Sequence, residues 1–205
     1  MAKGESIMFV RSRLAILAIV ASAVSWPAGA DTLNVQNCTW CHGISAQGYS
    51  NAPRLAGQRA RYIESELLRF GSHARNNPQS KQYMWGAVEA LSPEMGRRLA
   101  NYFSTLPAQA ADDGDKELAA AGRRIYEDGI PDSNIVSCVV CHGPNAEGIR
   151  EIPRLGGLSS AYVKRRLEQW GEGYDAASAS PMPRIASTLP PDVIDAVASY
   201  LSFIK

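Results

Sequence analysis

The sequence of 205 residues lacks two features that would assign it to common classes of protein. It has no strong excess of one charge, because its formal net charge is only +1, so nothing in its composition suggests a nucleic-acid partner. After the first thirty residues it also has no apolar run long enough to cross a bilayer. We therefore expect the processed protein to be soluble and to reach a membrane only through a partner protein.

A third absence concerns secondary structure, since no stretch alternates apolar and polar residues as a half-buried strand does. Apolar residues instead recur at helical spacing from Tyr62 to Phe70, and again from Tyr162 to Trp170. Gly71 and Gly171 follow these segments as stop signals. The sequence therefore predicts an all-α protein.

The first thirty residues have the pattern of a secretory signal peptide. Arg11 and Arg13 precede an apolar run at residues 14–26, and Ala28-Gly29-Ala30 forms a small-x-small cleavage site. The run is about half as long as a membrane-spanning helix requires, so an uncleaved anchor is the weaker alternative. We expect a signal peptide at 1–30 and a processed chain that begins at Asp31.

Charge is distributed unevenly along the processed chain. Residues 31–107 carry 8 basic and 5 acidic side chains, whereas residues 108–205 carry 10 basic and 14 acidic ones. The first part is thus positive and the second negative, a dipole that can orient a protein against a charged partner. Two ordinarily solvated surfaces would give the same counts, so this alternative stays open.

An internal repeat determines the expected architecture. The segment Cys38-Thr-Trp-Cys41-His42-Gly43 recurs one hundred residues later as Cys138-Val-Val-Cys141-His142-Gly143. The offset later falls to 98, where two residues are missing before Met182. The chain is therefore a tandem duplication. Further matches are Pro53-Arg54-Leu55 with Pro153-Arg154-Leu155, Gly57 with Gly157, Met84 with Met182, Leu91 with Leu189, Pro93 with Pro191 and Tyr102 with Tyr200.

Between the two copies, residues 108–114 are small and polar and have no helical periodicity, which is typical of a linker. The sequence therefore predicts an N-terminal domain at 31–107 and a C-terminal domain at 115–205. A helical core of this size is only marginally stable unless a further group stabilises it. A large, apolar and covalently held cofactor would supply the missing buried surface.

A further helix is predicted near the end of each copy. In the first copy Ser92 is a plausible N-cap, Pro93 suits the first turn and Glu94 complements the helix dipole. The second copy has Pro190-Pro191-Asp192 at this place. The residues expected to face the core are Met95, Leu99 and Phe103 in the first copy and Val193, Ile194, Val197 and Leu201 in the second.

The four cysteines form two Cys-x-x-Cys pairs, and each pair is followed at once by a histidine. This is the attachment signature of haem c. One helical turn brings residues i and i+3 to the same side, so both thiols can form thioethers with the haem vinyl groups, and the histidine can bind the iron. The residues concerned are Cys38, Cys41 and His42 in the first copy and Cys138, Cys141 and His142 in the second.

Three other interpretations of the cysteines are less favoured. A structural zinc site would pool all four thiolates, whereas each pair here belongs to its own copy. A thioredoxin-type pair would need a βαβ setting, which the sequence does not predict. Disulfides are possible in an exported chain, but they give no reason for the histidines.

The sixth ligand of each iron can be sought among residues that occur in both copies. His73 and Met95 have no counterpart of the same type in the second copy, whereas Met84 and Met182 correspond. Each of these two methionines is expected in a loop just before the last helix. We expect Met84 and Met182 to bind the irons, with His73 in place of Met84 as a minor alternative. Thioether ligation raises the reduction potential and leaves no open position, which suits electron transfer.

Four residues are candidates for supporting contacts around the haems. Pro53 and Pro153 lie eleven residues after their histidines, and their carbonyls could accept the second N–H of each imidazole. Arg54 and Arg154 could pair with haem propionates or cross the domain interface, although surface salt bridges would explain them nearly as well.

Together these motifs resemble class I cytochromes c, and their duplication in one exported chain is similar to the dihaem cytochrome c4 family, over nearly all of residues 33–205. The resemblance implies two tandem class I cytochrome c domains related by pseudo-two-fold symmetry, with two covalently bound haem c groups near the interface. It further implies a periplasmic single-electron carrier between respiratory-chain donors and a terminal oxidase or reductase. Such a carrier is no enzyme and has redox proteins as partners, with no small-molecule substrate.

One departure from the family pattern supports an alternative. A predicted helix at 115–128 precedes Cys138, but only seven residues separate the cleavage site from Cys38. The first helix of the N-terminal domain is therefore expected to be truncated, as in the dihaem subunit of flavocytochrome c sulfide dehydrogenase. The alternative is an electron-transfer subunit of a periplasmic flavoprotein or dehydrogenase complex. A dihaem peroxidase is least favoured, because it needs an open iron.

Overall fold

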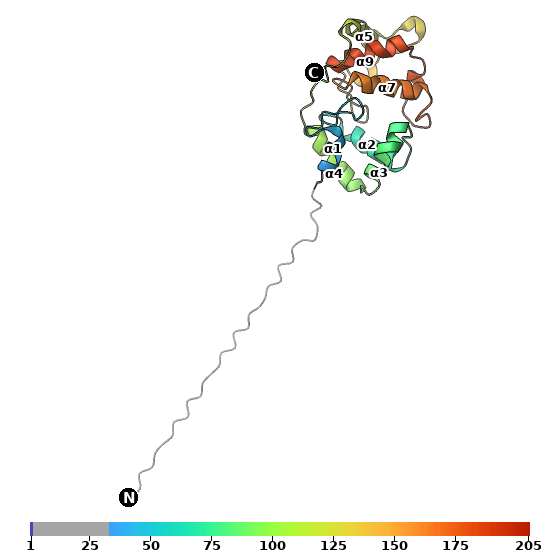
Figure 1. Ribbon diagram of the computed structural model, residues 1–205. Coiled ribbons are helices and arrows are strands. Elements are labelled where there is room, and N and C mark those ends of the chain that lie inside the picture. Colours follow the sequence, from blue (N-terminus) through green and yellow to red (C-terminus); the bar gives the residue numbers. More distant parts are fainter. Residues whose placement is uncertain (2–32) are drawn as a thin grey trace. The chain divides into compact units, whose positions relative to one another are not determined.

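The computed structural model describes Met1 and residues 33–205, and the latter form one compact unit (Figure 1). The predicted signal peptide and the cleavage site before Asp31 lie outside the described residues, apart from Met1. Within residues 33–205 the regular elements are helices, accompanied by two isolated β-bridges, which confirms the all-α prediction. No helix in this range is long and apolar enough to cross a membrane.

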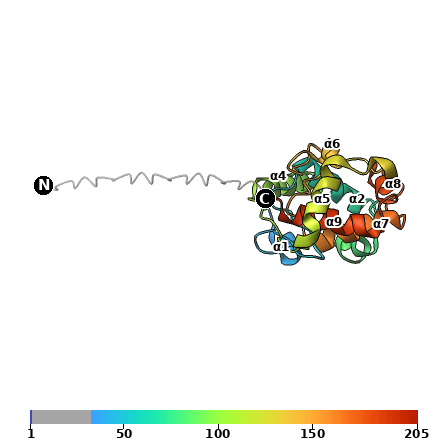
Figure 2. The same ribbon diagram turned by 90° about the horizontal axis from the view of Figure 1, so that it is seen from above.

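Most helices of one copy correspond to a helix of the other, as Figures 1 and 2 show. In the first copy the helices are α1 (Gln36–His42), α2 (Ala60–Gly71), a π-helical turn (Ser80–Met84), α3 (Trp85–Val88) and α4 (Pro93–Thr105). In the second they are α5 (Lys116–Asp128), a 3₁₀ turn (Pro131–Ser133), α6 (Val139–His142), α7 (Ser160–Gly171), α8 (Met182–Ala186) and α9 (Pro191–Phe203). Within the described residues, α5 has no counterpart in the first copy.

The helix ends follow the local signals of the sequence. Helices α2 and α7 end at Gly71 and Gly171, as the stop signals predict. The Ser92 hydroxyl accepts a hydrogen bond from the Met95 amide at 3.2 Å, so Ser92 is the N-cap of α4 and Pro93 its first residue. Local sequence therefore sets these boundaries.

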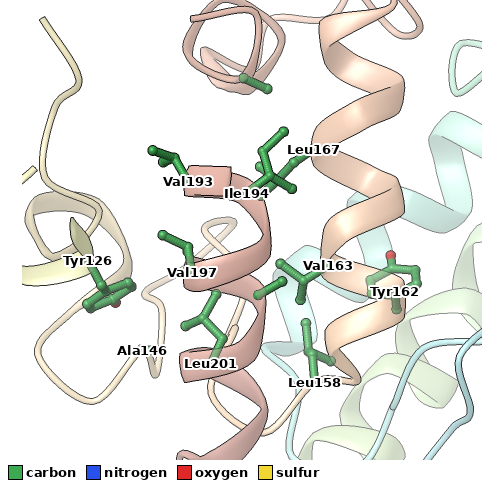
Figure 3. Packing of buried hydrophobic residues seen from close by; sticks show 12 residues of the cluster. Tyr126, Ala146, Leu158, Tyr162, Val163, Leu167, Val193, Ile194, Val197 and Leu201 are labelled. Carbon is green, nitrogen blue, oxygen red and sulfur yellow. The ribbon is translucent and has the colours of Figure 1, made fainter. Parts of the chain in front are cut away.

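Each copy has a hydrophobic cluster of its own. In the first, Ile63 of α2 packs with Leu99 and Phe103 of α4. In the second, α9 is central, with α5 and α7 on either side of it (Figure 3). The buried residues Val193, Ile194, Val197 and Leu201 of α9 confirm the core face expected for this helix. The division into two domains around 108–114 stays a prediction.

Residues 111–114 are hydrogen-bonded to the second copy, whereas Gln109 is hydrogen-bonded to Gln47 and Arg54 of the first. The Asp112 amide donates to the Ser202 carbonyl at 3.1 Å. The Asp113 carboxylate accepts from the Ser160 amide at 2.8 Å and from the Ser159 hydroxyl at 2.7 Å, at the start of α7. The segment therefore forms no helix of its own and connects the copies through hydrogen bonds to both of them.

Helices α5 and α9 cross very closely at Gly122, and they lie side by side in Figures 1 and 2. A Cβ atom added at Gly122 would lie 1.9 Å from the Ala196 carbonyl oxygen. Because that oxygen belongs to the backbone, movement of a side chain could not remove the clash. The first copy has Arg98 where α9 has Ala196, and Arg98 is exposed. The sequence of α4 is therefore unsuited to a close crossing of this kind.

We expect Gly122→Ala to lower the free energy of unfolding by roughly 1–3 kcal/mol, as overpacking of a core does, because the backbones of α5 and α9 must separate. Gly71→Ala is the matched control, since nothing lies within 4 Å of its added Cβ. The control should be neutral or slightly stabilising. Urea unfolding followed by circular dichroism measures both, and equal midpoints would contradict the close crossing.

Candidate functional site

Each Cys-x-x-Cys-His segment lies on one helical turn, in α1 and at the start of α6. None of the four cysteines in these turns forms a disulfide; the first of each pair is half-buried and the second is exposed. Burial, followed by the charge of the second cysteine, raises the pKa of Cys38, and the same causes raise that of Cys138 to about 11. A thioredoxin-type cysteine needs a lowered pKa, so the structure does not favour that interpretation.

The cysteines do not assemble into a metal centre with other side chains. Among the described residues, no group of three or more His, Cys, Asp or Glu side chains is arranged to hold a metal ion. The pooled zinc site considered from sequence is therefore not formed. Each pair of thiols instead stands alone beside its own histidine.

The two histidines are buried and held in the same way. His42 Nδ1 lies 2.6 Å from the Pro53 carbonyl oxygen, and His142 Nδ1 lies 3.0 Å from that of Pro153. Burial lowers the pKa of both rings, against the opposing effect of the carbonyls. A neutral imidazole that donates from Nδ1 presents an unprotonated Nε2, and no hydrogen bond within the described residues uses that atom.

A tight loop brings each proline carbonyl back to its histidine. The Gly48 amide donates to the His42 carbonyl at 2.8 Å, and Gly148 does the same to His142. Gly48 has φ +76°, and a Cβ there would lie 2.4 Å from the Arg54 amide nitrogen. Only glycine fits this turn, so the glycine six residues after each histidine has a direct role in placing the acceptor.

The methionines lie on short helical turns, so the expectation of a loop was wrong in detail. Met84 ends the π-helical turn, and Met182 begins α8. Buried Asn77 holds the start of the π-helical turn, because its side-chain oxygen accepts from the Ser80 amide at 3.1 Å and its nitrogen donates to the Ser80 hydroxyl at 2.7 Å. Such turns are frequent at functional sites. Iron ligation by Met84 and Met182 stays a prediction.

The other two candidates for the sixth position are engaged elsewhere. The ring of His73 stacks on that of Trp85, with 3.8 Å between centroids and 13° between planes. Trp85 is itself held by a hydrogen bond from its indole nitrogen to the Arg75 carbonyl at 2.9 Å. Met95 packs against the hydrophobic cluster of the first copy.

Arg54 crosses from the first copy to the second. It is 4% exposed, and its guanidinium donates to the carbonyls of Gly156 at 2.6 Å and Gly157 at 2.8 Å. Burial, and then the charge of Arg154, lower the pKa of Arg54 to about 10, which still leaves it protonated at neutral pH. Arg154 does not mirror it, since its Nε bonds only to Gly156 of its own copy, at 3.3 Å.

The residues around the two sites fit a covalently bound haem. Each site supplies two thiols on one helical turn and a neutral imidazole with a free nitrogen. Three buried N–H groups in the first copy make no hydrogen bond within the described residues: Arg54 Nε, Arg69 Nη2 and Arg75 Nε. These are donors that haem propionate carboxylates could satisfy.

Sequence reasoning missed several buried polar residues where the copies meet. Gln58 exchanges two hydrogen bonds with the backbone of Arg154, at 2.9 and 2.7 Å. Glu66, Arg75 and Asp175 are buried and charged. A comparison of charges at matched repeat positions would have revealed part of this set, because Glu66 in the first copy matches an arginine in the second.

Comparison with known proteins gives consistent results. The cytochrome c family model matches residues 119–205. A cytochrome c4 of Thiocapsa roseopersicina is 32% identical over 80% of this chain and 85% of its own length. A thiosulfate dehydrogenase electron acceptor of Thiomonas intermedia is 34% identical over 75% of this chain and 70% of its own. The structure of an Acidithiobacillus ferrooxidans cytochrome c4 matches with a TM-score of 0.76 at 30% identity, over 82% of this chain and 99% of that one.

Proposed function

Because this chain belongs to the cytochrome c4 family of dihaem electron carriers, we propose that it works in the periplasm and passes single electrons from respiratory-chain donors to a terminal oxidase or reductase. It carries two covalently bound haem c groups, whose irons supply the one-electron chemistry. The observation that carries the proposal is the doubled arrangement of a thiol pair beside a buried histidine held by a proline carbonyl.

The chain's own residues would hold each haem in a form suited to electron transfer. The cysteine pairs Cys38 with Cys41 and Cys138 with Cys141 attach the porphyrin edge, and the proline carbonyls fix the orientation of the histidine rings. We assign Met84 and Met182 as sixth ligands. A histidine and a methionine held at each iron would leave no place for a substrate, so the chemistry the site would supply is electron transfer alone.

A second candidate is supported by the relatives and by the N-terminal copy. Some related proteins are described as electron acceptors of thiosulfate dehydrogenase. In the first copy, α4 leaves Arg97, Arg98, Asn101 and Tyr102 exposed, on a helix whose counterpart α9 is covered by α5. The alternative is therefore a dihaem electron acceptor or subunit that serves a periplasmic dehydrogenase acting on a sulfur compound.

Size-exclusion chromatography of native protein, released gently from the periplasm, separates these two candidates. For a free carrier we expect elution at the mass of the processed chain with its two haems, and rapid oxidation by membranes that contain terminal oxidases. A flavoprotein or thiosulfate-oxidising dehydrogenase that co-elutes through successive columns and reduces the haems would overturn the first candidate and support the second. Protein left in the cytoplasmic fraction would contradict the periplasmic location.

A further inference from the structure

Two buried ion pairs lie where the first and second copies meet, and their charges are exchanged between the copies. In the first copy, Glu66 on α2 pairs with Arg75 in the loop that follows. In the second, Arg166 on α7 pairs with Asp175 in the corresponding loop, at 2.8 Å. In both pairs the partners are nine positions apart in the sequence, and positions 66 and 166 are equivalent in the repeat. All four residues are at most 8% exposed, so solvent screens them little.

Hydrogen bonds across the interface join these pairs. The Asn76 amide donates to the Asp175 carboxylate at 2.7 Å, and the Asp175 amide donates to the Asn76 side-chain oxygen at 3.1 Å. This exchange joins the loop after α2 to the loop after α7, and we take the pseudo-two-fold axis of the repeat to pass between these two loops. Arg75 also donates to the Tyr162 hydroxyl at 3.3 Å. Figure 3 shows Tyr162 on the side of α7 away from α9.

The charges act on each other across this axis. Burial works against ionisation of Asp175, but hydrogen bonds from Arg166 and the Asn76 amide, with the charges of Arg166 and Arg75, outweigh it and lower its pKa. Arg75 belongs to the other copy, so the attraction extends beyond the local ion pair. Positive charge on the first loop therefore faces negative charge on the second.

This arrangement is complementary only between unlike copies. If two first copies met in the same way about a two-fold axis, Arg75 would face Arg75. If two second copies met, Asp175 would face Asp175. Like charges buried together are strongly unfavourable. We propose that the exchanged ion pairs are a recognition device, which selects pairing of the first copy with the second and disfavours pairing of like copies from two chains.

The device can be tested in the full-length holoprotein by exchanging the charges of one copy. The double variant Arg166→Glu with Asp175→Arg keeps an ion pair within the second copy but presents like charges across the axis. A compensated variant adds Glu66→Arg and Arg75→Glu, which restores opposite charges. We expect the double variant to show a larger radius of gyration by X-ray scattering and separate urea transitions for the two copies. The compensated variant should return toward the wild-type radius and a single transition.

A double variant that matches the wild type in both measurements would show that each pair serves only its own copy, and would overturn the proposal. A double-mutant cycle with less disruptive substitutions tests the proposal if the charge-exchanged variants fail to fold. It compares Arg75→Gln, Asp175→Asn and their combination, which remove charge but keep polar groups. We expect the combined shift in urea midpoint to be smaller than the sum of the single shifts, and additive shifts would contradict a charge interaction across the axis. These readouts are size and unfolding, so they do not depend on the identity of the redox partners.

Discussion

A Met182→His substitution should lower the reduction potential of the C-terminal haem and leave that of the N-terminal haem nearly unchanged. Imidazole stabilises ferric iron relative to thioether sulfur, so the shift should be a substantial part of the roughly 0.8 V over which axial ligands set haem potentials. Met182 is half-buried at the start of α8, where it packs against the hydrophobic cluster that contains the core face of α9. A spectroscopic redox titration resolves the two haems, and half of the near-infrared methionine–iron band should disappear.

Two control variants sharpen this result. Met95→Leu should leave both potentials unchanged, because Met95 packs in the cluster of the first copy. His73→Gln should also leave them unchanged, because the ring of His73 stacks on Trp85. An unaltered titration of Met182→His would refute the ligand assignment, and a change in the N-terminal haem on His73→Gln would favour the histidine alternative for that site.

Replacing Cys138 and Cys141 together with alanine should leave one covalent haem per chain. The two cysteines of this pair are the attachment points of the haem, and Cys138 also packs against the cluster that contains Val197 and Leu201. Loss of the haem therefore removes a large part of the buried surface of residues 115–205, and we expect this copy to unfold at a lower urea concentration than the first. The pyridine haemochrome assay, scaled to protein mass, measures the haem content.

The mirror variant, Cys38→Ala with Cys41→Ala, should retain the other haem and weaken the first copy instead. Each single-haem protein should show only one redox step, and the two remaining potentials should differ between variants. A double-alanine protein that still carries two covalent haems would contradict the assignment of one haem to each pair.

Much of the helical structure was predictable because it depends on neighbours in the chain. The ends of α2 and α7, the cap at Ser92 and the core face of α9 follow from local signals and periodicity. The place of Met84 was harder to foresee, since a π-helical turn held by Asn77 and Ser80 has no clear periodic pattern. Where the sequence predicted a loop around Met84, the structure has two short helical turns, the π-helical turn and α3.

The role of Arg54 shows why some contacts escape prediction. The sequence left haem propionates, the domain interface and surface salt bridges as alternatives for this residue. The carbonyls of Gly156 and Gly157 that it binds lie more than one hundred residues away, and any backbone carbonyl can accept from a guanidinium. Sequence alone has no means of choosing among such acceptors.

The sequence by itself determined that the chain is a tandem repeat with one thiol pair and one histidine per copy, because covalent attachment requires these residues at a fixed spacing. Only the tertiary structure decided how the copies meet. In the sequence, Glu66 and Arg166 look like ordinary surface charges of two helices. In the folded chain they are buried with their partners Arg75 and Asp175 where the two copies meet. Burial and opposition across an axis are properties of the folded chain, since they depend on which distant segments come into contact.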